Sequence, residues 1–203
     1  MAKFLAWVLG MAAVAALALY ELVLDVWVVP ADDPLLTASV APTLSPGDVV
    51  LVARHSTLDH GYLARCPDPD APGRFVVARA IAKAGETVTF DGEIVNVDGH
   101  HTPAARRCDP ADVVVHDPTS GNDLTLACEV EEYGEVNFSV LRSFANPRAA
   151  QKRTVDAGRW FLVSDDRHVH LDSRDFGDVD ARACEHVLFR VAKPGELALA
   201  LLW

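Results

Sequence analysis

A serine, two histidines and an Asp-Ser-Arg triplet are the residues of this chain whose types and spacing suggest hydrolytic chemistry. Ser39 lies in the segment Thr-Ala-Ser-Val-Ala-Pro-Thr-Leu at residues 37–44, where Pro42 restrains the backbone. Far along the chain, His168 and His170 precede Asp-Ser-Arg at residues 172–174. A serine hydroxyl is a poor nucleophile until a base removes its proton. These residue types therefore point to attack by a serine that depends on a neighbouring base.

The two segments together resemble the signature of bacterial type I signal peptidases, which are membrane-bound serine proteases that remove signal peptides from exported proteins. Ser39 matches the serine of the family's Ser-x-x-Pro-Thr-Leu motif, and Gly-Asp follows at residues 47–48. The resemblance implies that Ser39 is the nucleophile. Thr37 occupies the position whose hydroxyl, in many relatives, helps to hold the oxyanion, because it can donate to developing negative charge. A structural cap is the alternative role for Thr37.

The second segment matches the family almost as well, with departures at Ser164 and Asp166, which replace a glycine and an asparagine. Asp and Arg side chains at such positions usually brace a site and do not react, because a charged fork can lock a loop in place. We therefore expect the matching residues to support the serine loop: Asp165, Asp172, Ser173 and Arg174.

The main departure is at the family's catalytic lysine. The family reads Lys-Arg-x-x-Gly-x-x-Gly-Asp, whereas this chain reads Ala-Arg-Ala-Ile-Ala-Lys-Ala-Gly-Glu from Ala78 to Glu86, so Ala78 stands where the lysine is expected. Lys83 is five residues further along, and in an extended strand it would point to the opposite face. Lys83 is therefore a poor candidate for the base.

A second change could compensate for the first. In relatives a serine two residues before Asp-Ser-Arg contacts the lysine amine, and here His170 holds that place. Because histidine is a natural base near neutral pH, we hypothesise a Ser39–His170 dyad. The alternatives are a catalytically inactive relative or another base. His168 shares a strand face with His170 and would orient it or join it on a metal. No other feature indicates a metal, and no cofactor is expected.

The N-terminus reads as a membrane anchor. Lys3 precedes an uncharged run from Phe4 to Tyr20, and apolar sequence continues to Pro30, which is expected to end the helix. A cleavable signal peptide with small residues at 16–18 is the competing interpretation. The position of Lys3 places the rest of the chain outside the cytoplasm.

Four cysteines fit an oxidising compartment: Cys66, Cys108, Cys128 and Cys184. Three pairings are possible, and Cys108 with Cys128 is the pair closest in sequence. Because no pair has C-x-x-C spacing, a zinc site is not expected. The net charge of −11 argues against nucleic acid as a partner.

Between the anchor and the end of the chain, many short strands are separated by turn signals, which predicts a mostly β domain that is partly closed on itself. Strands are expected at 48–53, 75–81, 87–90, 93–97, 113–116, 124–130, 135–141, 160–163 and 186–191, with loops at 55–73 and 146–157. Asp91-Gly92 between two of these strands is a strong hairpin signal.

The predicted organisation is an anchor at 1–30, a signal-peptidase-like β domain at 31–196 and an apolar tail at 197–203, which docks on the domain or rests in the membrane interface. Two functions fit. The first is a single-pass membrane serine endopeptidase whose partners are secretory preproteins and membrane lipid. The second is an inactive homologue that binds an extended secreted peptide as a chaperone or assembly factor.

Overall fold

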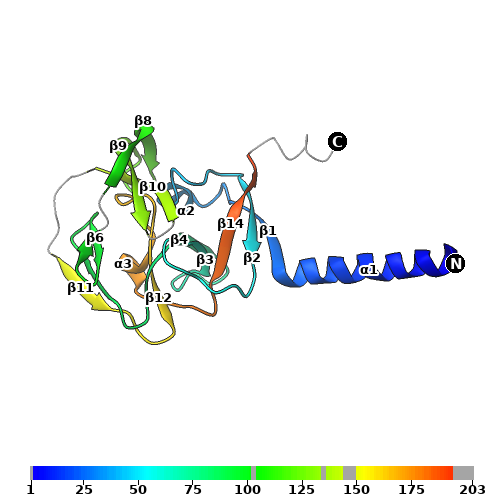
Figure 1. Ribbon diagram of the computed structural model, residues 1–203. Helices are drawn as coiled ribbons and strands as arrows, with labels where there is room; N and C mark the ends of the chain where they lie inside the picture. Colours follow the sequence, from blue (N-terminus) through cyan, green and yellow to red (C-terminus); the bar gives the residue numbers. More distant parts are fainter. Residues whose placement is uncertain (1, 102–103, 134–135, 144–149, 194–203) are drawn as a thin grey trace.

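The computed structural model describes residues 2–101, 104–133, 136–143 and 150–193, and it shows one long helix leading into a mostly β domain (Figure 1). The predicted fold class is confirmed in this respect. The helices are α1 (Ala2–Val23), α2 (Pro34–Ser39) and α3 (Ser173–Phe176). The strands are β1 (Leu24–Val28), β2 (Val49–Ala53), β3 (Leu63–Pro67), β4 (Phe75–Lys83), β5 (Thr87–Phe90), β6 (Val95–Val97), β7 (His100–His101), β8 (Ala104–Asp117), β9 (Asn122–Tyr133), β10 (Val136–Arg142), β11 (Gln151–Thr154), β12 (Arg159–Val163), β13 (Val179–Asp180) and β14 (Glu185–Ala192).

The largest sheet has seven antiparallel strands in the order β1-β2-β14-β3-β4-β12-β13. Both of its faces are covered, as the dense apolar sequence of β4 requires. On one face, Val77 packs with Val50 and with Leu36 of α2. On the other face, Ala78 packs with Ala64 and a different set of apolar residues. Successive side chains of a strand point to opposite faces of the sheet. Val77 therefore faces α2, whereas Ala78 faces the other side.

Two smaller sheets complete the β structure of the described residues. One has the order β10-β9-β8, and the other has the order β11-β5-β6-β7. The predicted hairpin at Asp91-Gly92 is confirmed, since β5 and β6 pair antiparallel and Gly92 has a positive φ of 86°. The disulfide between Cys108 and Cys128 joins β8 to β9, and a second disulfide joins Cys66 of β3 to Cys184 just before β14.

The N-terminal helix differs from the prediction in its extent. Helix α1 ends at Val23 and not at Pro30, because Leu24–Val28 pairs with β2 as the edge strand of the main sheet. Asp25 consequently lies in a strand, where its carboxylate pairs with Arg54 and Arg65. The helix extends away from the strands in Figure 1. The expected transmembrane helix is not supported: in the part of the chain that the structure describes, no helix is both long and apolar enough to cross a membrane.

Two predicted loops contain strands. The segment 55–73 includes β3, which pairs with β4 through a fully buried ladder around Ala64 and Ala78. The segment 146–157 includes β11, which pairs with β5 but keeps all four side chains exposed. Pairing with neighbouring strands overrides the polar composition of both segments. The apolar tail at 197–203 lies outside the described residues.

Candidate functional site

Ser39 is the last residue of the short helix α2. Asp33 caps the start of this helix, where its carboxylate accepts a hydrogen bond from the Leu36 N–H at 3.1 Å, and Pro34 supplies a favourable first residue. Leu36 and Val40 anchor the segment on the main sheet through the cluster that contains Val77. Packing on both sides leaves Ser39 fully buried.

The polar groups of Ser39 are both engaged. Its hydroxyl donates to the carbonyl of Leu36 one turn earlier, at 2.9 Å. Its own carbonyl accepts a hydrogen bond from the N–H of Asp166 at 3.0 Å. The second contact joins the serine segment directly to the loop that carries the other signature residues.

A buried ionic network makes a second connection between these segments. The hydroxyl of Thr43 donates to the carboxylate of Asp165, and Arg79 donates to the same carboxylate from Nε at 3.0 Å. Arg79 also donates to the Thr43 hydroxyl at 3.3 Å. Asp165 is fully buried, and Arg79 pairs with it at 3.0 Å. Strand β4, the serine segment and the second signature segment are thus tied together by three side chains.

Asp172 and Arg174 organise the second segment. Asp172 caps α3 and accepts hydrogen bonds from the Ser164 N–H at 2.7 Å and from the Arg174 guanidinium at 2.7 and 3.0 Å. Burial alone would raise the pKa of Asp172, but the charge and hydrogen bonds of Arg174 outweigh it and hold that pKa well below its usual range. Ser173 accepts from the Leu162 N–H at 2.9 Å. These residues bind the loop to β12, and their predicted supporting role in catalysis stays a prediction.

Ala78, at the position of the family's lysine, is completely buried. Its neighbours are apolar and include Ala64, Leu162 and the partly buried Leu171. An alanine methyl group offers no proton acceptor, so this position supplies no base.

His170 lies between the surroundings of Ser39 and those of Ala78. The preceding residue, Val169, packs with Ala38, and the following residue, Leu171, packs in the cluster of Ala78. Its Nδ1 atom lies 2.8 Å from Oδ2 of Asp175, which leaves Nε2 without a partner among the described residues. Within the described residues no hydrogen bond joins Ser39 to His170, so the structure brings their segments together without joining their side chains.

The second histidine of the pair faces elsewhere. Nδ1 of His168 lies 2.9 Å from Glu93 and 3.0 Å from the hydroxyl of Ser143, so His168 does not orient His170. His170 and two carboxylates do have ligand atoms within 4.8 Å of one another, namely those of Asp172 and Asp175. Because Arg174 already occupies the Asp172 oxygens, we assign no metal to this cluster.

Two other candidates have definite positions. The Thr37 hydroxyl donates a hydrogen bond to the carbonyl of Pro34, which lies 3.1 Å away and three residues earlier in the same helix. Its predicted oxyanion role would require that hydroxyl to turn, and it stays a prediction. Lys83 lies exposed at the end of β4.

Sequence reasoning missed the importance of Asp166. Its carboxylate is fully buried, and Oδ1 accepts hydrogen bonds from the N–H groups of His168 at 2.9 Å and Val169 at 2.8 Å. Oδ2 is buried and has no hydrogen-bond partner among the described residues. Burial raises the pKa of Asp166 to about 7, against the two N–H groups and the charge of His168, which lower it. The available signal was the aspartate itself, which replaces the asparagine of the motif that this segment resembles.

Comparison with known proteins identifies the family of this chain. The family model described as "Signal peptidase, peptidase S26" matches residues 4–187. Signal peptidase I from two strains of Streptococcus pneumoniae, serotype 4 (ATCC BAA-334 / TIGR4) and ATCC BAA-255 / R6, is 23% identical over 158 residues, which cover 71% of this chain and 72% of each relative. The chain belongs to the signal peptidase family, peptidase S26.

Proposed function

We propose that this protein is a serine endopeptidase that removes signal peptides from exported preproteins, with Ser39 as the nucleophile. The observation that carries the proposal is the hydrogen bond from the Asp166 N–H to the Ser39 carbonyl, which joins the two signature segments. The Thr43–Asp165–Arg79 network supports it, because it fixes the same two segments on β4. Family membership supports secretory preproteins as the substrates.

We further propose that His170 is the general base and that Asp175 orients it. A hydrogen bond at Nδ1 leaves the lone pair of Nε2 to accept a proton, which is the arrangement of carboxylate, imidazole and hydroxyl in serine hydrolases. For this chemistry the Ser39 hydroxyl has to leave the Leu36 carbonyl and turn toward the imidazole. Hydrogen bonds between catalytic groups are often long or poorly aligned before substrate binds.

The experiment is a cleavage assay on a model preprotein with the full chain and matched variants. Ser39→Ala should reduce cleavage to background, and His170→Ala should reduce it by at least about a hundredfold, the usual contribution of a general base. His168→Ala is the matched control, since this histidine lies on the same loop but faces Glu93. Circular dichroism and thermal unfolding would check that each variant folds.

Three results would overturn parts of this proposal. Cleavage by His170→Ala at the parent rate would eliminate His170 as the base, and cleavage by Ser39→Ala would eliminate the nucleophile. A parent chain that binds preprotein without cleaving it would identify a binding protein. In that event the double variant Ala78→Lys, His170→Ser would test whether the family's usual pair restores hydrolysis.

We also propose that the β domain works outside the cytoplasm, with the chain held at the membrane surface through α1. The two disulfides support an oxidising compartment, where such bonds persist. Large apolar side chains that are exposed on α1, such as Phe4, Leu5 and Trp7, support contact with lipid.

A further inference from the structure

Asp166 is a buried carboxylate on the loop between β12 and α3, and it contacts both halves of the candidate site. Its N–H donates to the carbonyl of Ser39 at 3.0 Å. Its Oδ1 atom accepts hydrogen bonds from the N–H groups of His168 at 2.9 Å and Val169 at 2.8 Å. The next residue is His170. One residue therefore binds the segment of the proposed nucleophile and closes the turn that leads to the proposed base.

The backbone on both sides of Asp166 is held by strand β10. The N–H of Leu141 donates to the carbonyl of Asp165 at 2.9 Å, and the N–H of Arg167 donates to the carbonyl of Leu141 at 2.8 Å. After Arg167 the chain turns, and an aspartate that accepts from the second and third N–H groups after it replaces a backbone turn by its side chain. The position of the residues that follow thus depends on the Asp166 carboxyl group.

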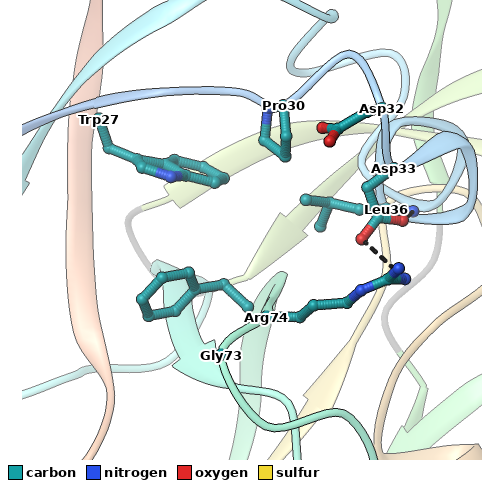
Figure 2. A pocket seen from close by; sticks show the side chains of 8 residues that line it. Trp27, Pro30, Asp32, Asp33, Leu36, Gly73 and Arg74 are labelled. Carbon is teal, nitrogen blue, oxygen red and sulfur yellow. Dashed lines mark hydrogen bonds and ion pairs between the residues drawn. The ribbon is translucent and has the colours of Figure 1, made fainter.

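The helix that carries Ser39 has supports of its own. Figure 2 shows the start of α2, where Asp33 faces the Arg74 guanidinium at 3.6 Å. Leu36 is almost completely buried in the cluster between this helix and the main sheet. A change in the turn at Asp166 would therefore move the proposed base relative to the proposed nucleophile.

The surroundings of Asp166 favour a neutral carboxyl group. The residue is completely buried, and its Oδ2 atom has no hydrogen-bond partner in the described part of the chain. A protonated carboxyl group leaves one O–H unbonded there, whereas an ionised one leaves a buried charge with no cation in contact. The charge is the more costly of the two. Opening the turn would relieve that cost, because it lets the carboxylate reach water.

Two charged groups face Asp166, and they oppose each other. His168 on the same loop favours the ionised carboxylate, while Glu93, from the turn between β5 and β6, disfavours it. These two groups pair with each other at 2.9 Å. The other charged side chains around the loop are paired among themselves: Arg167 and Arg142 with Glu131, and Asp165 with Arg79. Burial is therefore decisive, and it raises the pKa of Asp166 to about 7.

We propose that Asp166 is a positioning residue that aligns His170 with Ser39, and that it does so only while its carboxyl group is protonated. The inference rests on the proposed function, in which these two residues are base and nucleophile. The site then loses its alignment as pH rises above neutral. Asparagine has nearly the same shape and no ionisable group, so it should keep the turn at every pH.

A kinetic experiment tests this role with the full chain and a model preprotein. At pH 6, Asp166→Ala should lower kcat by about a hundredfold, the cost of misplacing a reacting group by roughly 1 Å, with KM nearly unchanged. Asp166→Asn should match the parent at that pH. The ratio of its kcat to that of the parent should rise about tenfold by pH 8, because a group with a pKa of about 7 ionises between these limits. Titration of His170 is common to both proteins and cancels in the ratio.

Asp68 offers a matched control on the loop between β3 and β4. Its carboxylate accepts hydrogen bonds from the N–H groups of Asp70 at 2.8 Å and Ala71 at 3.2 Å, which is the same kind of turn away from the site. Asp68→Ala should leave kcat and its pH profile unchanged. Thermal unfolding of each variant would show that the assay compares folded proteins.

Amide hydrogen exchange tests the turn without any cleavage. The quantity is the protection of the N–H groups of His168 and Val169, corrected for the intrinsic exchange rate at each pH. In the parent it should fall about tenfold between pH 6 and pH 8, because ionisation of Asp166 favours the open turn. In Asp166→Asn it should stay constant.

The outcomes separate this inference from the proposed function. A kcat ratio that is constant with pH, or an Asp166→Ala variant that cleaves like the parent, would overturn the inference and leave the peptidase in place. If the parent cleaves nothing, the peptidase is rejected and the exchange data decide on Asp166. Loss of protection with pH in the parent alone would support its hold on the turn, and the same pH dependence in Asp166→Asn would overturn it.

Discussion

Replacing Asp166 by asparagine should stabilise the protein at neutral and alkaline pH while leaving its stability at acidic pH nearly unchanged. The buried carboxylate of Asp166 holds the loop beside Ser39, and one of its oxygens has no partner in the described part of the chain. Asparagine has nearly the same shape, and its side-chain oxygen can accept the same two N–H groups. The substitution therefore removes a charge with little change in packing.

The direction of this pH dependence follows from the number of protons that Asp166 binds in the folded and unfolded chains. With a pKa of about 7 in the fold and 3.8 as its ordinary value, Asp166 binds more protons in the native state between these limits. Stability is then highest below pH 3.8 and falls as pH rises through about 7. The pKa difference corresponds to about 4 kcal/mol in total, at 1.36 kcal/mol per pKa unit. About 2–3 kcal/mol of this falls between pH 5 and pH 8.

The groups that face Asp166 modify this titration. The charge of His168 lowers the pKa of Asp166, and the charge of Glu93 raises it. Glu93 pairs with His168 at 2.9 Å, so the two partly cancel. Burial is therefore the main cause of the raised pKa of Asp166. Asparagine avoids the cost of burying a charge, because its side chain is neutral.

The assay is urea unfolding of the parent and of Asp166→Asn at pH 5, 6, 7 and 8. The difference between their free energies of unfolding should grow by about 2–3 kcal/mol across this range. Asp156→Asn, at an exposed position, is the control and should show a constant difference near zero. Parallel pH profiles for the parent and Asp166→Asn would refute the reasoning, because they would mean that Asp166 titrates alike in the folded and unfolded chains.

Two further predictions concern the disulfides and the location of the domain. Replacing both cysteines of the Cys66–Cys184 pair by serine should lower the free energy of unfolding by about 5 kcal/mol, against about 3 kcal/mol for the Cys108–Cys128 pair, because their sequence separations are 118 and 20 residues. Urea titrations of the two double variants would test this order, and the reverse order would contradict the loop-entropy argument. Protease added to the outer face of intact cells should digest the β domain, and complete protection there would place that domain in the cytoplasm.

Local patterns in the sequence were sufficient for much of the sheet structure. The strand around Ala78 and the hairpin at Asp91-Gly92 appear where apolar, β-branched runs and a turn signal indicate them. Strands β3 and β11 were missed, because their sequences are polar or interrupted and only their partners in the sheet make them strands. The end of α1 was misplaced for the same reason, since a long-range pairing with β2 takes over at Leu24.

The candidate site could likewise be predicted only in part from the sequence. A motif located Ser39 and the residues around Asp172, but it could not reveal that α2 buries Ser39 or that Asp166 holds its carbonyl. The helix itself had a readable signal in Asp33-Pro34, a good cap followed by a good first residue. Contacts between segments more than a hundred residues apart leave no comparable mark in a single sequence.

The position of β14 has a consequence for how this protein folds during its synthesis. Strand β14 is the last strand of the described chain, yet it lies between β2 and β3 and so joins two ladders that are otherwise separate. During synthesis, two separate ladders can form before β14 is available, namely β1-β2 and β3-β4-β12. They share no sheet until residues 185–192 have left the ribosome. Such non-local pairing is slow, because the chain loses the entropy of closing a long loop before the stabilising strand contacts form. A nascent chain therefore cannot assemble its complete central sheet before β14 itself has been synthesised.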